Sequence, residues 1–347
     1  MPTSITLAII GLDRLGTSLG LALKRYAKTP NASYQFTILG YDESSENRQT
    51  AKTLGAIDQE VATPEQAVSQ AALILQTIHP GAQTDLYTIA GGSVQPGAVI
   101  VDFGPSASRT LALATQHLPK NPQGQPLAYV ISAAAIINPA LLHEPLNGIA
   151  AARADLLDNG GLSLAPMPDC HPDAVQLAAD LGGLLGVPIK FADPLEQEGM
   201  IAAMEGLPLL AALGLFQMTA HSAGWDDLRQ LGNPLFVLET IGLSQRSPDD
   251  PAAFFAGDRD RAVRALTAYI ENLQVIRELL QADDRTQLNS AFARAVTGRD
   301  EWLTARRARN WEAKTTVTPT EKISFMGVLG ARFLPGPLRP GAKGDTK

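Results

Sequence analysis

The sequence predicts an α/β fold in which a doubly wound parallel sheet is followed by an all-helical region. Apolar runs typical of strands alternate with helical patterns through the N-terminal half, which is the order of elements in a parallel sheet. These runs are continuously apolar rather than alternating, so helices are expected on both faces of the sheet. After the sequence APMPDCHP the pattern becomes almost wholly helical.

The predicted strands are short apolar runs bounded by turn residues. They span residues 5–10, 36–41, 72–78, 98–103 and 127–133. Helical patterns between several of them span residues 15–26, 45–54, 82–90 and 108–117. In the C-terminal half, a short apolar stretch at 187–191 accompanies helices predicted at residues 173–185, 194–222, 228–241, 260–281 and 284–309.

The length of the chain predicts more than one domain. At 347 residues, two domains are expected. We place their boundary in APMPDCHP, so that residues 1–168 form a nucleotide-type domain and residues 169–314 a helical domain. Residues 315–347 are rich in Pro, Gly and Lys and are expected to form a flexible tail.

The charge and cysteine content indicate a protein that acts on small molecules. With 28 Lys and Arg against 35 Asp and Glu, the net charge of −7 disfavours a basic surface for nucleic acid. The single cysteine, Cys170, excludes an internal disulfide, and the five histidines show no metal-ligand spacing. Cys170 and His171 lie in a Pro-rich linker, where we expect a surface loop and no nucleophile. Since no targeting segment precedes the first strand, we predict a cytoplasmic protein. The histidine spacing predicts that no metal is bound.

One segment is apolar enough to suggest a membrane span. From residue 200 to 220 the only charged residue is Glu205, and about 20 apolar residues span a bilayer. The segment also contains Gly206 and Pro208, and no Lys/Arg asymmetry flanks it. We therefore predict no membrane contact, and a helix in the centre of a large core or at a dimer interface.

The strongest local motif is a glycine turn between the first strand and the first helix. In ITLAIIGLDRLGTSLGLAL, Gly11 and Gly16 stand where a Rossmann-type fold binds the pyrophosphate of a dinucleotide. The candidate cofactor-binding residues are Gly11, Leu12, Asp13, Arg14, Leu15 and Gly16. Asp13 replaces the second glycine of the motif, and a carboxylate about 4 Å from a phosphate costs about 1 to 4 kcal/mol. Either adjacent Arg14 offsets this charge, or the domain has lost or altered nucleotide binding.

Two residues at other strand ends extend the cofactor prediction. Asp42 ends the second strand in LGYDES, where a carboxylate accepts hydrogen bonds from the adenosine ribose. It favours NAD, with NADP as the alternative, for which Arg48 on the next helix is a weak argument. His79 follows the third long strand, at the edge that lines the cofactor crevice, and is a candidate to contact the nicotinamide half.

A wider resemblance rests on the order and spacing of several segments between about residue 5 and about residue 280. They read GLDRLGTSLGLAL, LGYDES, LGAIDQ, QAALILQTIHPGA, QPGAVIVDFG, NGIAAARADLL and LAPMPDCHPDAVQLAADLGGLLGVPIKFADPLEQE. In this order they resemble the prephenate/arogenate dehydrogenase (TyrA-like) family. The resemblance implies a Rossmann domain, a helical dimerisation domain and hence a homodimer. It also implies hydride transfer from prephenate or arogenate to NAD(P), with loss of carbon dioxide, in tyrosine biosynthesis.

The family's proton-accepting histidine is missing. It belongs to a Gly-Gly-His-Pro-Met-Ala-Gly motif, and this chain has AAAIINPALLHEPLNG instead, with Asn138 in the histidine's place when the prolines are matched. Asparagine cannot act as a base near neutral pH. Three interpretations stay open: His143 has taken over, the proton leaves through water, or the site no longer performs this chemistry.

Other site positions also depart from the family. The serine after the family's Asp-Val-Gly becomes Pro105, with Ser106 one place later. The Ser-His-Leu-Pro-His motif appears as EGLPL, without either histidine. The arginine used for a substrate carboxylate falls at or beside Gln245, so that the adjacent Arg246 is our candidate.

Two hypotheses follow. The first is an NAD(P)-dependent oxidoreductase that acts on prephenate, arogenate or a related small carboxylate, with Ser106, Asn138 and His143 at the reacting centre and Arg246 on the carboxylate. The second is a non-catalytic dimeric protein that keeps the fold for ligand sensing or a structural role. Cofactor binding distinguishes the two.

Overall fold

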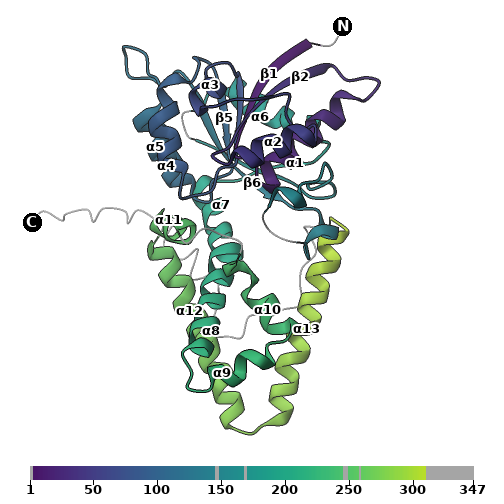
Figure 1. Cartoon of the computed structure of the whole chain (residues 1–347). Coiled ribbons are helices and arrows are strands. Elements are labelled where there is room, and N and C mark those ends of the chain that lie inside the picture. Colours follow the sequence, from purple (N-terminus) through teal and green to yellow (C-terminus); the bar gives the residue numbers. More distant parts are fainter. Residues whose placement is uncertain (1–2, 145–147, 168–169, 245–248, 258, 310–347) are drawn as a thin grey trace, which may run out of the picture. The chain divides into compact units, whose positions relative to one another are not determined.

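The computed structural model describes residues 3–144, 148–167, 170–244, 249–257 and 259–309 (Figure 1). Among these, one compact unit extends to Ala262 and takes in the end of the last helix from Leu303, and a second is Val263–Trp302. The boundary between residues 168 and 169 stays a prediction.

The first unit contains an eight-stranded sheet in the order β3-β2-β1-β4-β5-β6-β7-β8. The strands are β1 (Thr3–Ile10), β2 (Tyr34–Tyr41), β3 (Gln59–Glu60), β4 (Leu73–Gln76), β5 (Val99–Asp102), β6 (Tyr129–Ile136), β7 (Gly161–Pro166) and β8 (Ile189–Phe191). All neighbours pair in parallel except β6 and β7. The mostly parallel sheet followed by a helical region confirms the predicted fold class.

Strand β7 is the main departure from the predicted elements. It runs antiparallel to β6, from Ile136 opposite Gly161 to Ile131 opposite Pro166. Its run, GLSLAP, ends in the first two residues of APMPDCHP, the segment that we took to end regular structure. The chain returns to the sheet at Gly160, where a Cβ would lie 1.8 Å from the Ile136 carbonyl oxygen.

Helices cover both faces of the sheet. They are α1 (Arg14–Ala27), α2 (Ser45–Thr53), α3 (Pro64–Val68), α4 (Gln83–Ala90), α5 (Ala107–His117) and α6 (Pro172–Leu185). Leu7 and Ile9 pack with residues of α1 and α6. Ala8 and Ile10 pack with residues of α3, α4 and α5, on the opposite face (Figure 1). The continuous hydrophobicity of β1 therefore reflects burial on two sides.

The C-terminal region is helical. The first unit continues with α7 (Pro194–Ile201), a π-helical turn (Ala202–Gly206), α8 (Leu207–Ala220), α9 (Trp225–Leu228), α10 (Pro234–Thr240) and α11 (Asp249–Gly257). Two long helices follow, α12 (Arg259–Gln281) and α13 (Arg285–Arg307). Short 3₁₀ turns occupy Gly91–Ser93, Pro139–Leu141, Ile149–Ala151, Arg229–Leu231 and Ile241–Leu243.

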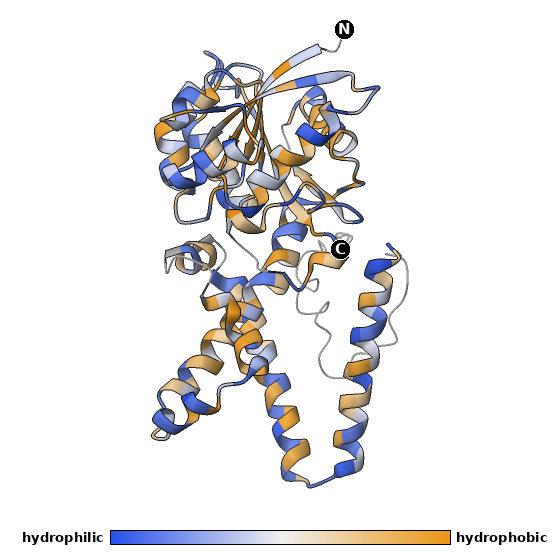
Figure 2. Ribbon diagram, turned by 45° about the vertical axis from the view of Figure 1, so that its right-hand side comes forward, coloured by the Kyte–Doolittle hydropathy of each residue, from blue (hydrophilic) through white to orange (hydrophobic). Residues whose placement is uncertain are grey.

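The apolar helix is mostly exposed among the described residues. Pro194–Ala220 is long and apolar enough to cross a membrane by length and composition, which by itself is weak evidence for a span. Many of its large side chains are exposed, among them Met204, Leu213 and Met218. Figure 2 colours much of this stretch as hydrophobic. The described residues do not surround this helix as a core would, so of the two expected settings the dimer interface is the one that stays a prediction.

Candidate functional site

The glycine turn between β1 and α1 packs tightly against the end of β4. Gly11 has a φ of 92°, and a Cβ on it would lie 2.7 Å from the Ile78 backbone nitrogen. A Cβ on Gly16 would lie 1.9 Å from the Gly11 carbonyl oxygen. The Thr77 hydroxyl donates to that same carbonyl at 2.7 Å. Glycine is therefore required at both positions by the approach of backbone to backbone.

Asp42 closes the turn from the neighbouring strand. The Leu12 N–H donates to Asp42 Oδ2 at 2.6 Å. Asp42 Oδ1 accepts from the Ser44 N–H at 2.9 Å and from Asn47 Nδ2 at 3.2 Å. A carboxylate has about four acceptor sites, so one on Oδ2 remains for a ligand. The Arg48 guanidinium donates to the carbonyl oxygen of Asp42, which places a cation beside the same strand end.

Asp13 occupies the N-cap position of α1 but does not cap the helix with its side chain. Its Oδ1 accepts instead from the Gly148 N–H at 2.6 Å. The φ of −80° at Asp13 suits any L-residue, so the backbone does not require the family's glycine here. What the side chain changes is the charge at the start of α1.

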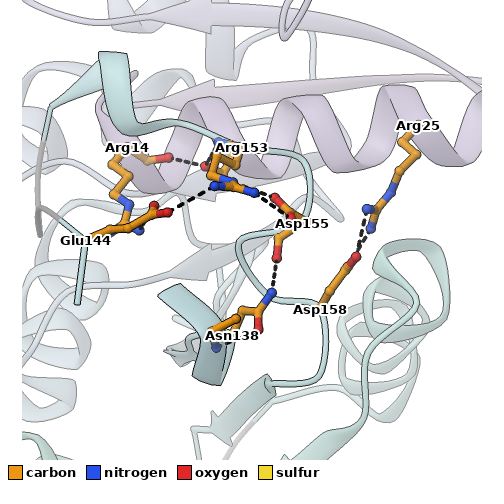
Figure 3. Close-up of polar contacts among 9 residues, drawn as sticks. Arg14, Arg25, Asn138, Glu144, Arg153, Asp155 and Asp158 are labelled. Carbon is orange, nitrogen blue, oxygen red and sulfur yellow. Dashed lines mark hydrogen bonds and ion pairs between the residues drawn. The ribbon is translucent and has the colours of Figure 1, made fainter. Parts of the chain in front are cut away.

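The Arg14 guanidinium contacts Glu144, and its charge also interacts with that of the adjacent Asp13. The distance from Arg14 Nη2 to Glu144 Oε2 is 3.3 Å, and the Arg14 residue is buried. Burial lowers the pKa of this guanidinium below its usual value. Arg153 donates to both Glu144 and Asp155, at 3.0 and 2.9 Å. Figure 3 shows this network beside α1. These contacts hold the segment that follows β6 against α1.

Asn138 belongs to that same connection. Its Oδ1 accepts from the Ala140 N–H and its Nδ2 donates to the Asp155 carbonyl, both at 3.1 Å. The residue is buried, and its amide caps the 3₁₀ turn Pro139–Leu141. His143 lies exposed in the next turn, and Arg246 lies outside the described residues. The catalytic and substrate roles of these residues stay predictions.

Ser106 is held by a carboxylate that the sequence analysis did not single out. Its hydroxyl donates to Glu198 Oε1 at 2.6 Å and accepts from the Arg109 N–H at 3.2 Å, as the N-cap of α5. The Ser108 hydroxyl donates to the other Glu198 oxygen at 2.7 Å. Glu198 is 3% exposed on α7, so this carboxylate joins α7 to the start of α5. Two serines at a helix start were the only local signal for such a partner.

A second buried carboxylate shapes the loop that leads to Ser106. Asp102 ends β5 and accepts from the Gly104 N–H at 2.6 Å and from the Tyr87 hydroxyl at 2.8 Å. Gln83 Nε2 donates to Asp102 Oδ2 at 3.2 Å. Desolvation raises the pKa of the Asp102 carboxyl, against the opposing effect of these donors.

His79 lies in the loop after β4, where it pairs with an acidic residue from a distant helix. The distance from His79 Nδ1 to Asp250 Oδ1 is 2.5 Å. The Gly81 N–H donates to the same oxygen at 3.2 Å. Asp250 stands in the first turn of α11, a helix that the sequence analysis missed although Asp-Asp-Pro is a typical helix start.

Helix α11 connects the two loops of this edge of the sheet. Its first turn contacts His79, and a Cβ on Gly257 in its last turn would lie 2.9 Å from the Ser106 hydroxyl oxygen. Arg109 Nη1 donates to the Ala253 carbonyl at 2.9 Å. The same helix fills the space beside Gly206, where a Cβ would lie 2.8 Å from Phe254 Cε1. Gly206 is where the family's motif carries a histidine, and a side chain there would require the Phe254 ring to shift.

Comparison with known proteins gives structural matches only. No protein-family model matches this sequence, and no curated protein matches it either. The prephenate dehydrogenase of A. aeolicus, solved with hydroxyphenyl propionate and NAD+, superposes with a TM-score of 0.69 at 16% identity, over 86% of this chain and 98% of that one. The arogenate dehydrogenase of Synechocystis has a TM-score of 0.62 at 16% identity, over 86% of this chain and all (100%) of that one.

The chain has the fold of prephenate and arogenate dehydrogenases. Since the match covers nearly the whole of both solved chains, it includes the helical region as well as the sheet. At this identity the likeness establishes the dehydrogenase fold, and the chemistry of the chain has to be argued from its own residues.

Proposed function

We propose that this protein is an NAD(P)-dependent dehydrogenase of the prephenate/arogenate type, which oxidises a small carboxylate substrate with loss of carbon dioxide in tyrosine biosynthesis. The proposal rests on the hydrogen bond between the glycine turn and Asp42. The Leu12 N–H donates to Asp42 Oδ2 at 2.6 Å, which orders the turn and sets the carboxylate at the end of β2. We also propose that the protein is cytoplasmic.

The residues at this edge of the sheet fit a dinucleotide. Gly11 and Gly16 let the backbone of the turn pack closely at the start of α1, where backbone amides and the helix dipole favour a pyrophosphate. The free acceptor site of Asp42 suits a ribose hydroxyl, and its charge repels a 2′-phosphate, which favours NAD over NADP. When bound, the nicotinamide supplies a hydride acceptor.

The remaining site residues would act from the neighbouring loops. Ser106 is fixed by Glu198, and Asn138 by the backbone around it, so each would position its loop rather than exchange a proton. Arg246 is proposed to bind the substrate carboxylate. The exposed apolar helices α8 and α10 are proposed to form a homodimer interface.

Calorimetric titration with NAD+ and NADP+ tests the cofactor half of the proposal. We expect NAD+ to bind more tightly than NADP+. The substrate half is then tested by following NADH formation with prephenate and with arogenate. Arg246→Ala should raise the KM for the active substrate, whereas Arg299→Ala, an exposed arginine on α13, should not.

A non-catalytic dimeric protein is the second candidate function. It is favoured by contacts within the protein that engage both polar atoms of the Asn138 amide and the Ser106 hydroxyl. This candidate predicts no heat with either dinucleotide at millimolar concentration, or binding without oxidation of either substrate.

A further inference from the structure

We propose that His79, oriented by Asp250, is the group that takes the proton from the substrate hydroxyl. This inference rests on the proposed dehydrogenase function and names its base. It starts from the pairing of a half-exposed imidazole with a buried carboxylate. The His79 side chain is 48% exposed and that of Asp250 is 9% exposed, with 2.5 Å between Nδ1 and Oδ1.

The pairing fixes which ring nitrogen is available. A carboxylate accepts but does not donate, so the Nδ1 atom of a neutral His79 carries the hydrogen and Nε2 carries the lone pair. The Gly81 N–H also donates to Asp250 Oδ1, at 3.2 Å, and holds the carboxylate in place. When Nε2 takes up a proton, the adjacent carboxylate stabilises the imidazolium. The same logic governs a histidine oriented by an aspartate in hydrolases.

His79 lies just after the carboxyl end of β4, beside the glycine turn. Thr77 and Ile78, immediately before it, contact Gly11 of the glycine turn. Strands β1 and β4 are parallel neighbours in the sheet. The strand order runs from β1 through β2 to β3 on one side and from β4 through β5 to β6 on the other. Ligands of such sheets bind in the crevice at the point where the order reverses. His79 therefore stands at the carboxyl end of β4, on the side of the turn away from Asp42, which is the side of the reacting ring.

The other histidines have different surroundings. His117 ends α5, and His143 is exposed in a turn. His171 caps α6 by accepting from the Asp173 N–H, and His221 follows the last turn of α8. All five histidines lie in the described part of the chain, and there only His79 pairs with a buried carboxylate.

The proposed step balances as follows. The O–H bond of the substrate alcohol breaks and its proton passes to His79 Nε2. The C–H bond at the same carbon breaks, and its hydride carries two electrons to NAD+. The oxygen lone pair left by the proton closes the carbon–oxygen double bond, so the alcohol is oxidised by two electrons, and His79 later releases its proton to water. Asp250 touches none of the reacting atoms and is a positioning residue.

Nuclear magnetic resonance of the full chain labelled with ¹⁵N-histidine tests the geometry without turnover. We expect the Nδ1–H form of His79, assigned by the loss of its signals in His79→Asn. Asp250→Asn should convert it to the Nε2–H form, because an amide can donate to Nδ1. Saturating NAD+ should shift the His79 Nε2 resonance. A wild-type His79 in the Nε2–H form, or one that bound NAD+ leaves unchanged, would overturn the proposal.

Kinetics test the chemical role with whichever of prephenate and arogenate is oxidised. His79→Asn retains a donor toward Asp250 and should lower kcat roughly 100-fold or more, with the Kd for NAD+ within about threefold of wild type. Added imidazole should restore part of the activity of His79→Ala, which a merely structural loss would not allow. His117→Gln, at the end of α5, is the matched control and should stay close to wild type. Full activity of His79→Asn would overturn the proposal.

The outcomes separate this inference from the proposed function. If neither dinucleotide binds, both fail together. If oxidation occurs and His79→Asn is unaffected, only the assignment of the base fails. If NAD+ binds and neither substrate is oxidised, the proposed substrates fail, and the resonance of His79 decides: a shift on NAD+ binding supports its place at the reacting ring, and no shift overturns it.

Discussion

At Gly16 a single methyl group has no room. A Cβ there would lie 1.9 Å from the Gly11 carbonyl oxygen and 2.5 Å from the Thr77 hydroxyl oxygen. The first contact is with backbone at the end of β1, which the sheet holds fixed. This glycine is thus a requirement of packing between strand and helix, whatever the turn binds.

We expect Gly16→Ala to destabilise the protein by about 3 kcal/mol, because the core must open to admit the methyl group. Gly183→Ala is the matched control: a Cβ at this position in α6 meets nothing within 4 Å. It should stabilise the helix by about 0.5 to 1 kcal/mol, since alanine loses less backbone entropy than glycine. Denaturant unfolding measures both, and equal effects would contradict the packing argument.

Asp13 places a negative charge at the start of α1. We expect Asp13→Asn to tighten NAD+ binding about tenfold, a gain of about 1.4 kcal/mol, by removing repulsion of the pyrophosphate. The Asn carbonyl oxygen keeps an acceptor for the Gly148 N–H. The control is Asp85→Asn, the same charge change in the first turn of α4. Titration calorimetry at two salt concentrations checks this, because the gain should shrink as salt rises.

Cys170 is less accessible than its Pro-rich surroundings suggested. It is half-buried and packs against the core, and burial raises the pKa of its thiol to about 11. The raised pKa keeps the thiol protonated in the folded protein at pH values where an unfolded thiol ionises. Its neighbour His171 is engaged as the cap of α6, so the two do not form a nucleophilic pair.

The raised pKa gives a direct prediction for alkylation. At pH 8 the folded protein should react with iodoacetamide roughly 100-fold more slowly than a free thiol, because only the thiolate is nucleophilic. The rate should continue to rise with pH toward about 11, well beyond the range in which a free thiol levels off. Urea-unfolded protein is the control and should react at the free-thiol rate. Mass spectrometry follows the adduct, and a fast reaction of the native chain would be inconsistent with the burial of Cys170.

At the scale of elements, the start of α5 and helix α7 share one carboxylate. Both oxygens of Glu198 accept from serine hydroxyls at the start of α5, at 2.6 and 2.7 Å. A carboxylate at a helix start is favoured by the dipole and by uncapped amides. This contact ties the helical region to the loop after β5, so the stability of the site depends on it.

Ser108→Ala should lower the free energy of unfolding by about 1.5 to 3 kcal/mol, because it removes a hydroxyl donor from a buried carboxylate, whose Oε2 then keeps only the long contact from the Ser108 N–H at 3.4 Å. In a Glu198→Gln background the same change should cost about 1 kcal/mol less, which is the coupling that a double-mutant cycle measures. Ser45→Ala, an exposed serine in the first turn of α2, should cost less than about 0.5 kcal/mol. Additive effects of the Ser108 and Glu198 changes would argue against the bond.

At the scale of the whole molecule, the described residues of the helical region leave several large apolar side chains exposed. Leu231, Leu235 and Leu238 are 75%, 68% and 65% exposed, and Met204 and Met218 are also exposed. Soluble monomers rarely expose apolar clusters of this extent, and a second copy of the chain is the partner that we propose for it.

Light scattering after size exclusion should give twice the chain mass of 36.8 kDa. Leu235→Lys with Leu238→Lys should shift the mass toward the monomer, because two charges would be buried at the proposed interface. The control is Ile89→Lys, a 55% exposed isoleucine on α4. A monomeric wild type, or one that stays soluble only with detergent, would contradict the proposed dimer and in the second case favour a membrane contact.

The sequence alone determined the local parts of this protein. Strand β1, the glycine turn and α1 are specified by neighbouring residues, and the continuously apolar strands predicted two covered faces correctly. Asp42 could be placed at the glycine turn because both lie at the ends of adjacent parallel strands. These features depend on short spacing and on periodicity, which a sequence displays directly.

Only the tertiary structure decided which distant side chains meet. His79 and Asp250 are 171 positions apart, and Ser106 and Glu198 are 92 apart. No local pattern encodes such pairs, because they are set by how helices pack across the end of the sheet. The antiparallel strand β7 and the exposed face of α8 were likewise settled by packing. The physical reason is that a hydrophobic run favours burial in general, while the chain's other elements determine what surrounds it.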